Sequence, residues 1–208
     1  MSLAIVFAAP LHWNTPASWE SAWGDYSFGG LGSVSGSGVS KTETRDLPEF
    51  TAIVIDYPAD IVIRQGEKQS VTISADDNLL PQLRTNVSGG VLTLTSRESS
   101  YQRRVNPTMP VRIEITVKDL RSVDYPTAGR VRIENFQTDS LEVNVDGAGE
   151  LSLDDVKIGR LTVDLNGAGS VSAQGTGDSV VLEMDGVGSF RGADFSVGTA
   201  RVTINGAG

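Results

Sequence analysis

The sequence predicts an all-β fold, a single-stranded parallel β-helix with rungs of about 20 residues and a less regular N-terminal half. Three observations support this class. A short glycine-containing phrase recurs at intervals of 19 or 20 residues, apolar and polar residues alternate strictly before each copy, and no long segment has a convincing helical period. A chain of 208 residues is long enough for one elongated solenoid.

The recurring phrase is Asp or Asn, then Gly, a small or apolar residue, and Gly. Its copies occupy 146–149, 166–169, 185–188 and 205–208, with a looser copy at 126–129. Matching positions of stacked rungs lie about 4.8 Å apart, so an Asn between two Asp residues separates their carboxylates by about 10 Å. Glycines here suit a corner that needs positive φ or close backbone approach. We interpret as a structural corner column Asp146, Gly147, Asn166, Gly167, Asp185, Gly186, Asn205 and Gly206.

The residues before each phrase alternate with a period of two, as in 141–146, 161–166, 180–185 and 200–205. This period predicts strands with one buried and one solvated face. Shorter apolar sets follow the glycines, at 151 and 153, at 171 and 173, and at 190. A leucine-rich repeat has a unit of similar length, but its Asn/Leu consensus and any helical stretch are missing, so parallel β-coils fit better.

Composition excludes several classes of function. The net charge of −9 and the pI of about 4.6 oppose binding to nucleic acid or to an anionic membrane through general electrostatics. Cysteine is absent, which excludes disulfides, a thiol nucleophile and thiolate metal ligands.

We expect two regions along the chain. Residues 1–46 form an apolar and aromatic N-terminal segment with a Gly/Ser-rich connector, and residues 47–208 form the β-helix domain. The first ten residues read either as a shortened signal or membrane anchor, which would allow N-terminal membrane association, or as a strand-like tail. Short strands are predicted in 50–55, 60–63, 71–73, 91–94 and 111–117, with a helical turn within 76–83.

A long irregular insertion between Ser96 and Pro110 carries a local basic island on an acidic protein. Its residues are Arg97, Tyr101, Arg103 and Arg104. Guanidinium groups beside an aromatic ring suit an anionic ligand, so this is a candidate ligand-binding loop; a solvated loop without a ligand is the alternative.

Residues for common catalytic and metal sites are scarce. The single histidine, His12, precedes the connector, which argues against a Ser-His-Asp triad and against zinc. Asp154 and Asp155 or the corner column offer oxygens to calcium, but the nonapeptide of calcium-binding β-rolls is missing. We therefore expect no catalytic residue, no metal and no cofactor. The enzymatic alternative is a polysaccharide-active site formed by Asp164 and Glu183, which should be outward neighbours on successive rungs.

Several motifs together carry a family resemblance. They are Gly36-Ser37-Gly38, Glu43-Thr44-Arg45, Phe50, 61–66, Asp76-Asp77-Asn78-Leu79-Leu80 and the Asn/Asp-Gly-Ala-Gly corners. In this series the region 36–208 resembles the bacterial auto-transporter adhesin head domain of the GIN type, formerly a domain of unknown function. The resemblance implies a right-handed β-helix, export to the periplasm, outer membrane or cell surface, and an adhesive or structural role. The family carries no agreed catalytic residues to transfer.

Two hypotheses of function follow. The leading one is an exported, non-enzymatic cell-envelope or cell-surface module that acts in adhesion or scaffolding, with surface glycans or envelope proteins as partners. The alternative is the β-helix enzyme that uses Asp164 and Glu183. We also expect an incomplete or uncapped C-terminal rung and homo-oligomers through exposed strand edges.

Overall fold

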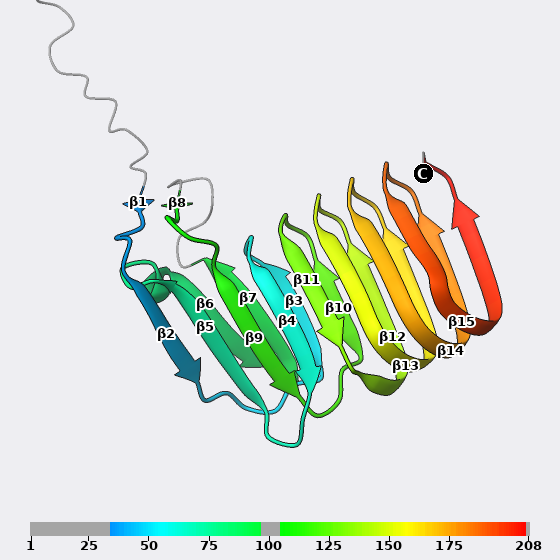
Figure 1. Cartoon of the computed structure of the whole chain (residues 1–208), viewed down its shortest axis with the longest axis horizontal. Helices are drawn as coiled ribbons and strands as arrows, with labels where there is room; N and C mark the ends of the chain where they lie inside the picture. The colour runs from blue at the N-terminus through cyan, green and yellow to red at the C-terminus, as the bar shows by residue number, and fades with distance from the viewer. Residues whose placement is uncertain (1–33, 97–104, 207–208) are drawn as a thin grey trace, which may run out of the picture.

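The computed structural model describes residues 34–96 and 105–206, and in these residues the protein consists of β-strands and one short 3₁₀ helix (Figure 1). The predicted all-β class is confirmed. The elements are β1 (Val34–Ser35), β2 (Ser40–Arg45), β3 (Ala52–Asp56), β4 (Asp60–Gln65), β5 (Ser70–Asp76), η1 (Leu80–Gln82), β6 (Leu83–Ser88), β7 (Val91–Ser96), β8 (Val105–Asn106), β9 (Arg112–Val117), β10 (Ser122–Tyr125), β11 (Arg130–Glu134), β12 (Gln137–Val145), β13 (Glu150–Leu165), β14 (Ser170–Met184) and β15 (Ser189–Ile204).

All described strands except the β1–β8 pair form one sheet, which curls so that two layers enclose an apolar core (Figure 1). In the C-terminal half, β10, β12, β13, β14 and β15 pair in parallel. One position runs through these strands as Val143, Val163, Leu182 and Val202, at intervals of 20, 19 and 20 residues. We call each segment that pairs in this way with the next one a rung.

A rung has three short sides, whereas the sequence indicated two. Along β13 the buried residues are Leu151 and Leu153, then Val156 and Ile158, and then Leu161, Val163 and Leu165. Two successive residues point outward after the first side, at 154–155, and again after the second, at 159–160. Because such a pair interrupts the alternation, each one marks a bend.

The first bend also explains the uneven repeat. Asp155 has a φ of 54°, and Asn135, twenty residues earlier, has a φ of 51°. The next rung lacks this residue, since the pairing changes from Leu153 with Ala173 to Val156 with Gly175. Removing one residue at the bend shortens the rung to 19 residues while the strands on both sides keep their register.

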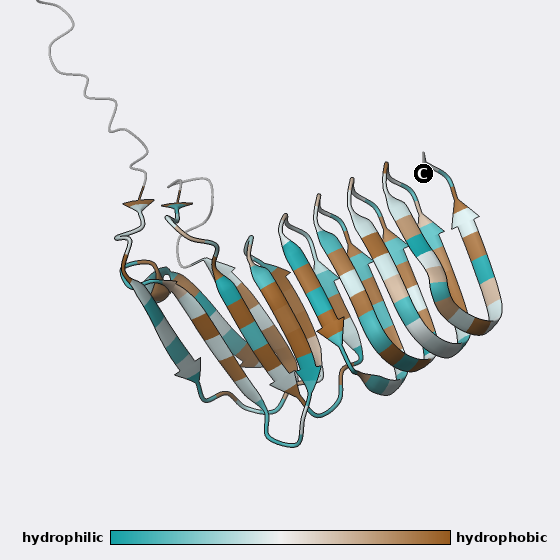
Figure 2. Cartoon of the chain, viewed as in Figure 1, coloured by the Kyte–Doolittle hydropathy of each residue, from teal (hydrophilic) through white to brown (hydrophobic). Residues whose placement is uncertain are grey.

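Burial follows the alternation. The core contains apolar side chains from every rung, and the bands of high and low hydropathy in Figure 2 alternate along the strands. Asp76 is the one buried charged residue in the described part of the chain.

The N-terminal half departs from a simple parallel stack. Here β3 lies between β7 and β10, and β4 lies between β9 and β11, so the spatial order of rungs differs from the sequence order. Three pairings are antiparallel, namely β2 with β5, β5 with β9, and β6 with β7. Only antiparallel strands can be joined by a tight turn, and Gly89 and Gly90, with φ of 59° and 79°, form such a turn between β6 and β7.

Motifs from distant parts of the sequence meet at this end of the molecule. The carboxylate of Asp76 accepts hydrogen bonds from the backbone N–H of Gly38 at 2.8 Å and from that of Thr108 at 3.0 Å. The Thr108 hydroxyl also donates to it. Asn78 binds the segment before Gly38, because its Oδ1 accepts from Ser37 N–H at 2.9 Å.

The core is closed at the same end. The guanidinium of Arg45 on β2 donates to the carbonyl oxygens of Leu80 at 3.2 Å and Leu83 at 2.8 Å. Leu79, Leu80 and Leu83 are all buried, and η1 supplies the helical turn that the sequence predicted. β2 pairs with β5 and so belongs to the main sheet, although it precedes residue 46. The boundary between connector and domain that the sequence analysis put at residue 46 stays a prediction.

We predict that Gly167→Ala destabilises the fold. A Cβ on Gly167 would collide with the carbonyl oxygen of Gly147 and would lie 2.7 Å from that of Asp146. The loss should be about 2 kcal/mol in the free energy of unfolding, measured in urea. In the matched control, Gly89→Asn, the positive φ suits Asn and no atom lies within 4 Å, so stability should change little. Equal stability of Gly167→Ala and the wild type would contradict the close stacking of corners.

A second prediction concerns pH. The Thr108 hydrogen bond lowers the pKa of Asp76 below its ordinary value of 3.8. The ionised carboxylate therefore stabilises the fold at pH values above the ordinary pKa of 3.8. Its contribution to the free energy of unfolding is lost as pH falls through the lowered pKa. We expect Asp76→Asn to lower the melting temperature at pH 7. The difference in melting temperature between the variant and the wild type should become smaller below about pH 4. Thermal unfolding across pH checks this, with the exposed Asp77→Asn as control. A gap that widens in acid would refute it.

Candidate functional site

The sequence predicts a basic island as a candidate ligand-binding loop. Arg97, Tyr101, Arg103 and Arg104 lie outside the described residues. Their role as a ligand-binding loop stays a prediction.

The corner column lies along one edge of the rungs. Asn166 Nδ2 donates to Asp146 Oδ1 at 3.0 Å, and Asn205 Nδ2 donates to Asp185 Oδ1 at 2.7 Å. The glycines that follow approach closely, because a Cβ on Gly186 or Gly206 would collide with the carbonyl oxygen of the glycine one rung away. Amide groups alternate with carboxylates along this edge, and the glycine backbones approach closely, so the structural role of the column stays a prediction that agrees with this geometry.

Asp164 and Glu183 are paired in register on neighbouring strands, between Asn144 and Thr203. Asp164 is half-buried, and Glu183 is exposed on an open strand face. Burial raises the pKa of Asp164, and the nearby carboxylates of Glu142, Asp146 and Asp185 raise it further.

The same acidic surface continues to β10. Burial raises the pKa of Asp124, and the charges of Asp146 and Glu142 raise it further. The sequence predicted the neighbouring pair Asp164 and Glu183, but not this wider gathering of carboxylates, which depends on how four strands align.

The other layer of the curled sheet carries balanced charge. Arg130 on β11 lies 3.8 Å from Asp60 on β4 and 3.3 Å from Glu150 on β13. In the next row Arg132 lies 3.3 Å from Asp154. Arg130 stands between acidic residues of the two adjacent strands, whereas Arg132 stands between Asp154 on β13 and Glu134 on its own strand, so ion pairs form both across and along the strands of this layer.

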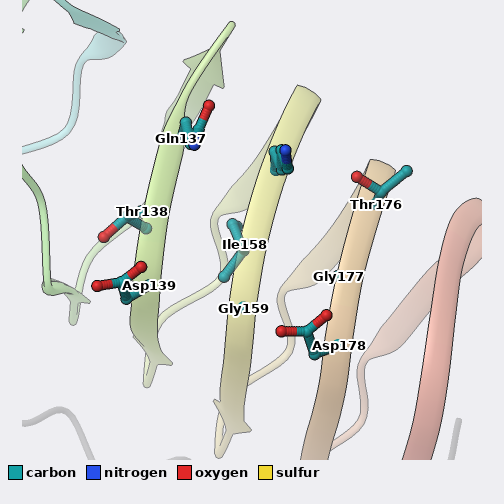
Figure 3. A pocket seen from close by; sticks show the side chains of 9 residues that line it. Gln137, Thr138, Asp139, Ile158, Gly159, Thr176, Gly177 and Asp178 are labelled. Carbon is teal, nitrogen blue, oxygen red and sulfur yellow. The ribbon is translucent and has the colours of Figure 1, made fainter.

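The third side of the rungs holds a shallow depression that the sequence did not indicate (Figure 3). It encloses about 210 Å³. One row is formed by Gln137, Lys157 and Thr176, which pair in register. Its lining is completed by Thr138, Asp139, Ile158, Gly159, Gly177 and Asp178.

A missing side chain creates the hollow. Gly159 lies between Asp139 and Asp178 (Figure 3), and a Cβ at this position would lie 2.6 Å from the Asp139 carbonyl oxygen. Two carboxylates therefore flank a floor of exposed backbone. The segments 137–139, 157–159 and 176–178 are spaced by 20 and 19 residues but share no residue pattern, so the spacing of the rungs was the one signal that pointed to this surface.

A second depression of about 230 Å³ lies beside the turn between β4 and β5. Its lining includes Glu49, Glu67, Gln69 and Lys118. The Gln69 amide nitrogen is buried without a hydrogen-bond partner. Because the segments that line this depression do not recur from rung to rung, it lacks the regular spacing of the third side.

Within residues 34–96 and 105–206, no three His, Cys, Asp or Glu side chains are grouped as a metal site requires. The same ranges contain no helix with the length and apolar character needed to cross a membrane.

The geometry thus defines an all-β protein whose curled sheet contains stacked parallel rungs and presents regular polar rows. The chain belongs to the family described as putative auto-transporter adhesin, head GIN domain, whose model matches residues 49–208. The family resemblance identified in the sequence is confirmed. A comparison with curated proteins finds no match.

Solved structures share the fold. A putative adhesin from Bacteroides fragilis is 23% identical, with a TM-score of 0.77 over 83% of this chain and 79% of that chain. A putative lipid binding protein from Parabacteroides distasonis is 20% identical, with a TM-score of 0.66 over 82% of this chain and 80% of that one. A putative adhesin from the same species is 17% identical, with a TM-score of 0.58 over 83% and 82% of the two chains.

We predict that Asp164→Asn stabilises the protein by roughly 0.5 kcal/mol, because it removes one of several facing like charges. Since the pKa of Asp164 is raised in the fold, the penalty exists above that pKa and disappears as pH falls through it. Urea unfolding at low salt and neutral pH should show the gain. The control is Glu150→Gln, which removes a carboxylate 3.3 Å from Arg130 and should give no gain. A less stable Asp164→Asn would contradict the repulsion.

Proposed function

We propose that the protein is an exported, non-enzymatic module of the cell envelope or cell surface that acts in adhesion or scaffolding. We further propose that its rungs wind as a right-handed single-stranded parallel β-helix, the hand that parallel strand connections almost always take. The adhesin descriptions of the family and of two similar structures support the assignment.

One observation carries the adhesive role: the outward polar groups form rows that repeat from rung to rung. Gln137, Lys157 and Thr176 succeed one another on adjacent strands, at steps of about 4.8 Å. Such a surface is long and shallow, and it offers hydrogen bonds to an extended ligand at regular intervals. A small substrate, by contrast, is usually held in a deep and mostly apolar cavity.

The third-side depression indicates the class of ligand. Its carboxylates, amide, hydroxyls and ammonium group are suited to bind hydroxyl-rich chains, so we propose neutral or amino-bearing glycans as the partner. The lining has two carboxylates, on Asp139 and Asp178, and one ammonium group, on Lys157, so its charge is negative. Because the whole chain also has a net charge of −9, this surface repels acidic glycans. For the basic island predicted from the sequence at 97–104, we propose anionic glycans as the ligand.

The competing function is a polysaccharide-active enzyme that uses Asp164 and Glu183. Their register pairing and the raised pKa of Asp164 favour it. Against it, Glu183 is exposed on an open strand face, and neither depression described above contains either residue. Adhesion needs no proton donor or enclosed site, so it agrees better with the geometry.

The test is binding of the full chain to an array of neutral, amino-bearing and acidic glycans. We expect binding to neutral or amino-bearing chains, and at least a tenfold loss in Asp139→Ala/Asp178→Ala, because about 1.4 kcal/mol of hydrogen bonding is enough for that change. The matched control is Glu142→Ala/Glu183→Ala, two exposed carboxylates on another face. No binding, or equal binding by both variants, would reject the proposal. Glycan turnover that stops in Asp164→Asn would favour the enzyme instead.

A further inference from the structure

The second depression lies on the same side of the molecule as the third-side depression. Its lining comes from the connections at 49–51, 67–69 and 118–119. Arg121 N–H donates to the Thr51 carbonyl oxygen at 2.7 Å, and the Arg121 carbonyl oxygen accepts from Glu142 N–H at 2.9 Å. The segments that run into this layer before β3, before β10 and within β12 therefore lie side by side, and residues 137–139 of the last one line the third-side depression.

The two depressions share a wall. The Thr138 hydroxyl, in the lining of the third-side depression, donates to Asp119 Oδ1 at 3.1 Å, and Asp119 lines the second depression. One residue back in each segment, Gln65 Nε2 donates to the carbonyl oxygens of Gln137 at 2.9 Å and Lys118 at 3.0 Å. Gln65 Oε1 accepts from Gln137 N–H at 3.0 Å. Because only these side chains separate the two hollows, a chain molecule that lies across the rungs can enter both.

The second depression is acidic. Its charged lining has three carboxylates, on Glu49, Glu67 and Asp119, and one ammonium group, on Lys118. Lys118 Nζ lies 3.6 Å from Glu67 Oε2, but the two side chains are 73% and 92% exposed, so water weakens this ion pair. A negative hollow attracts an ammonium group and repels a carboxylate or a sulfate. The charge therefore favours a ligand that carries an amine over a neutral ligand.

Gln69 supplies an unused hydrogen-bond donor. Its side chain lines the second depression, and its Nε2 is buried without a hydrogen-bond partner. A buried donor without a partner destabilises the fold. Since this nitrogen makes no hydrogen bond in the free protein, none is lost when the amide turns toward a ligand oxygen. Together with the hydroxyl of Thr51, the amide gives the depression polar groups that suit sugar hydroxyls.

We propose that the second depression is a subsite for an amino group, and that one amino-bearing glycan chain occupies it together with the third-side depression. This inference rests on the proposed function, because the third-side depression is the other half of the surface. Glu49 and Glu67 bind the ammonium group, and the Gln69 amide donates to an oxygen of the same sugar. Only a chain that is long enough to pass over the contact between Thr138 and Asp119 uses both hollows.

The first test compares the affinity of the full chain for a short and a long oligomer of glucosamine, by calorimetry. The wild type should bind the long oligomer at least tenfold more tightly, and the N-acetylated long oligomer should lose most of this gain. Glu49→Gln/Glu67→Gln should remove the gain and leave the affinity for the short oligomer nearly unchanged. The matched control is Glu114→Gln/Glu142→Gln, two exposed carboxylates outside both depressions, and it should bind as the wild type does.

The second test separates a ligand contact of Gln69 from a structural one. Gln69→Met keeps the length of the side chain and removes the unpartnered amide, so the free variant should be at least as stable as the wild type in urea. Its affinity for the long glucosamine oligomer should fall by about threefold, and its affinity for the short oligomer should not change.

Four results would overturn the subsite. They are equal binding of long and short oligomers by the wild type, no loss on N-acetylation, a gain with length that survives Glu49→Gln/Glu67→Gln, and unchanged binding by Gln69→Met. If glycans still bind in any of these cases and Asp139→Ala/Asp178→Ala abolishes the binding, the proposed function stands without the second subsite. If no glycan binds at all, both proposals fail.

Discussion

Parallel pairing between rungs in a constant register is the constraint on which the rest of the structure depends. No rung can bury its apolar residues alone, so each depends on its neighbours for a core. The register also fixes what each position can be. At the corner the rungs approach so closely that the carbonyl oxygen of Gly147 occupies the space that a side chain on Gly167 would need. Where the chain adds a residue at a bend, as at Asp155, the strands on both sides still align.

The same register determines the chemistry of each surface. Like positions stack, so a charge that recurs in sequence becomes a row in space. One layer separates its acidic residues with Arg130 and Arg132. The other gathers Asp124, Asp164 and their neighbours, and the pKa values of both groups are raised, first by burial and then by the nearby carboxylates. The third side replaces one side chain with Gly159 and leaves a polar hollow. A stack of this kind makes long regular surfaces, which suits contact with extended partners.

Local patterns predicted much of this and missed what is not local. Alternation before each corner located the strands at 141–145 and 161–165, and the spacing of the glycines predicted the offset between rungs. The third side was missed because Gly175 and Gly177 stand at the positions that Val156 and Ile158 occupy one rung earlier, so its apolar alternation does not repeat. The position of β3 between β7 and β10 was missed because no short-range pattern records a pairing such as Val54 with Asp124. The N-terminal half was predicted to be less regular, and its three antiparallel pairings are the form that this irregularity takes.

The most direct test of the stacked register is a distance between spin labels on Glu114 and Arg191, which are both exposed. The register connects them through Val62, Arg132, Ser152 and Ser172, a path of five strand-to-strand steps. Five steps of this register predict a backbone separation of about 24 Å, measured in samples diluted with unlabelled chain. A stack in simple sequence order would remove the step through β4 and give about 19 Å. That shorter value, or a broad distribution without a peak, would contradict the architecture.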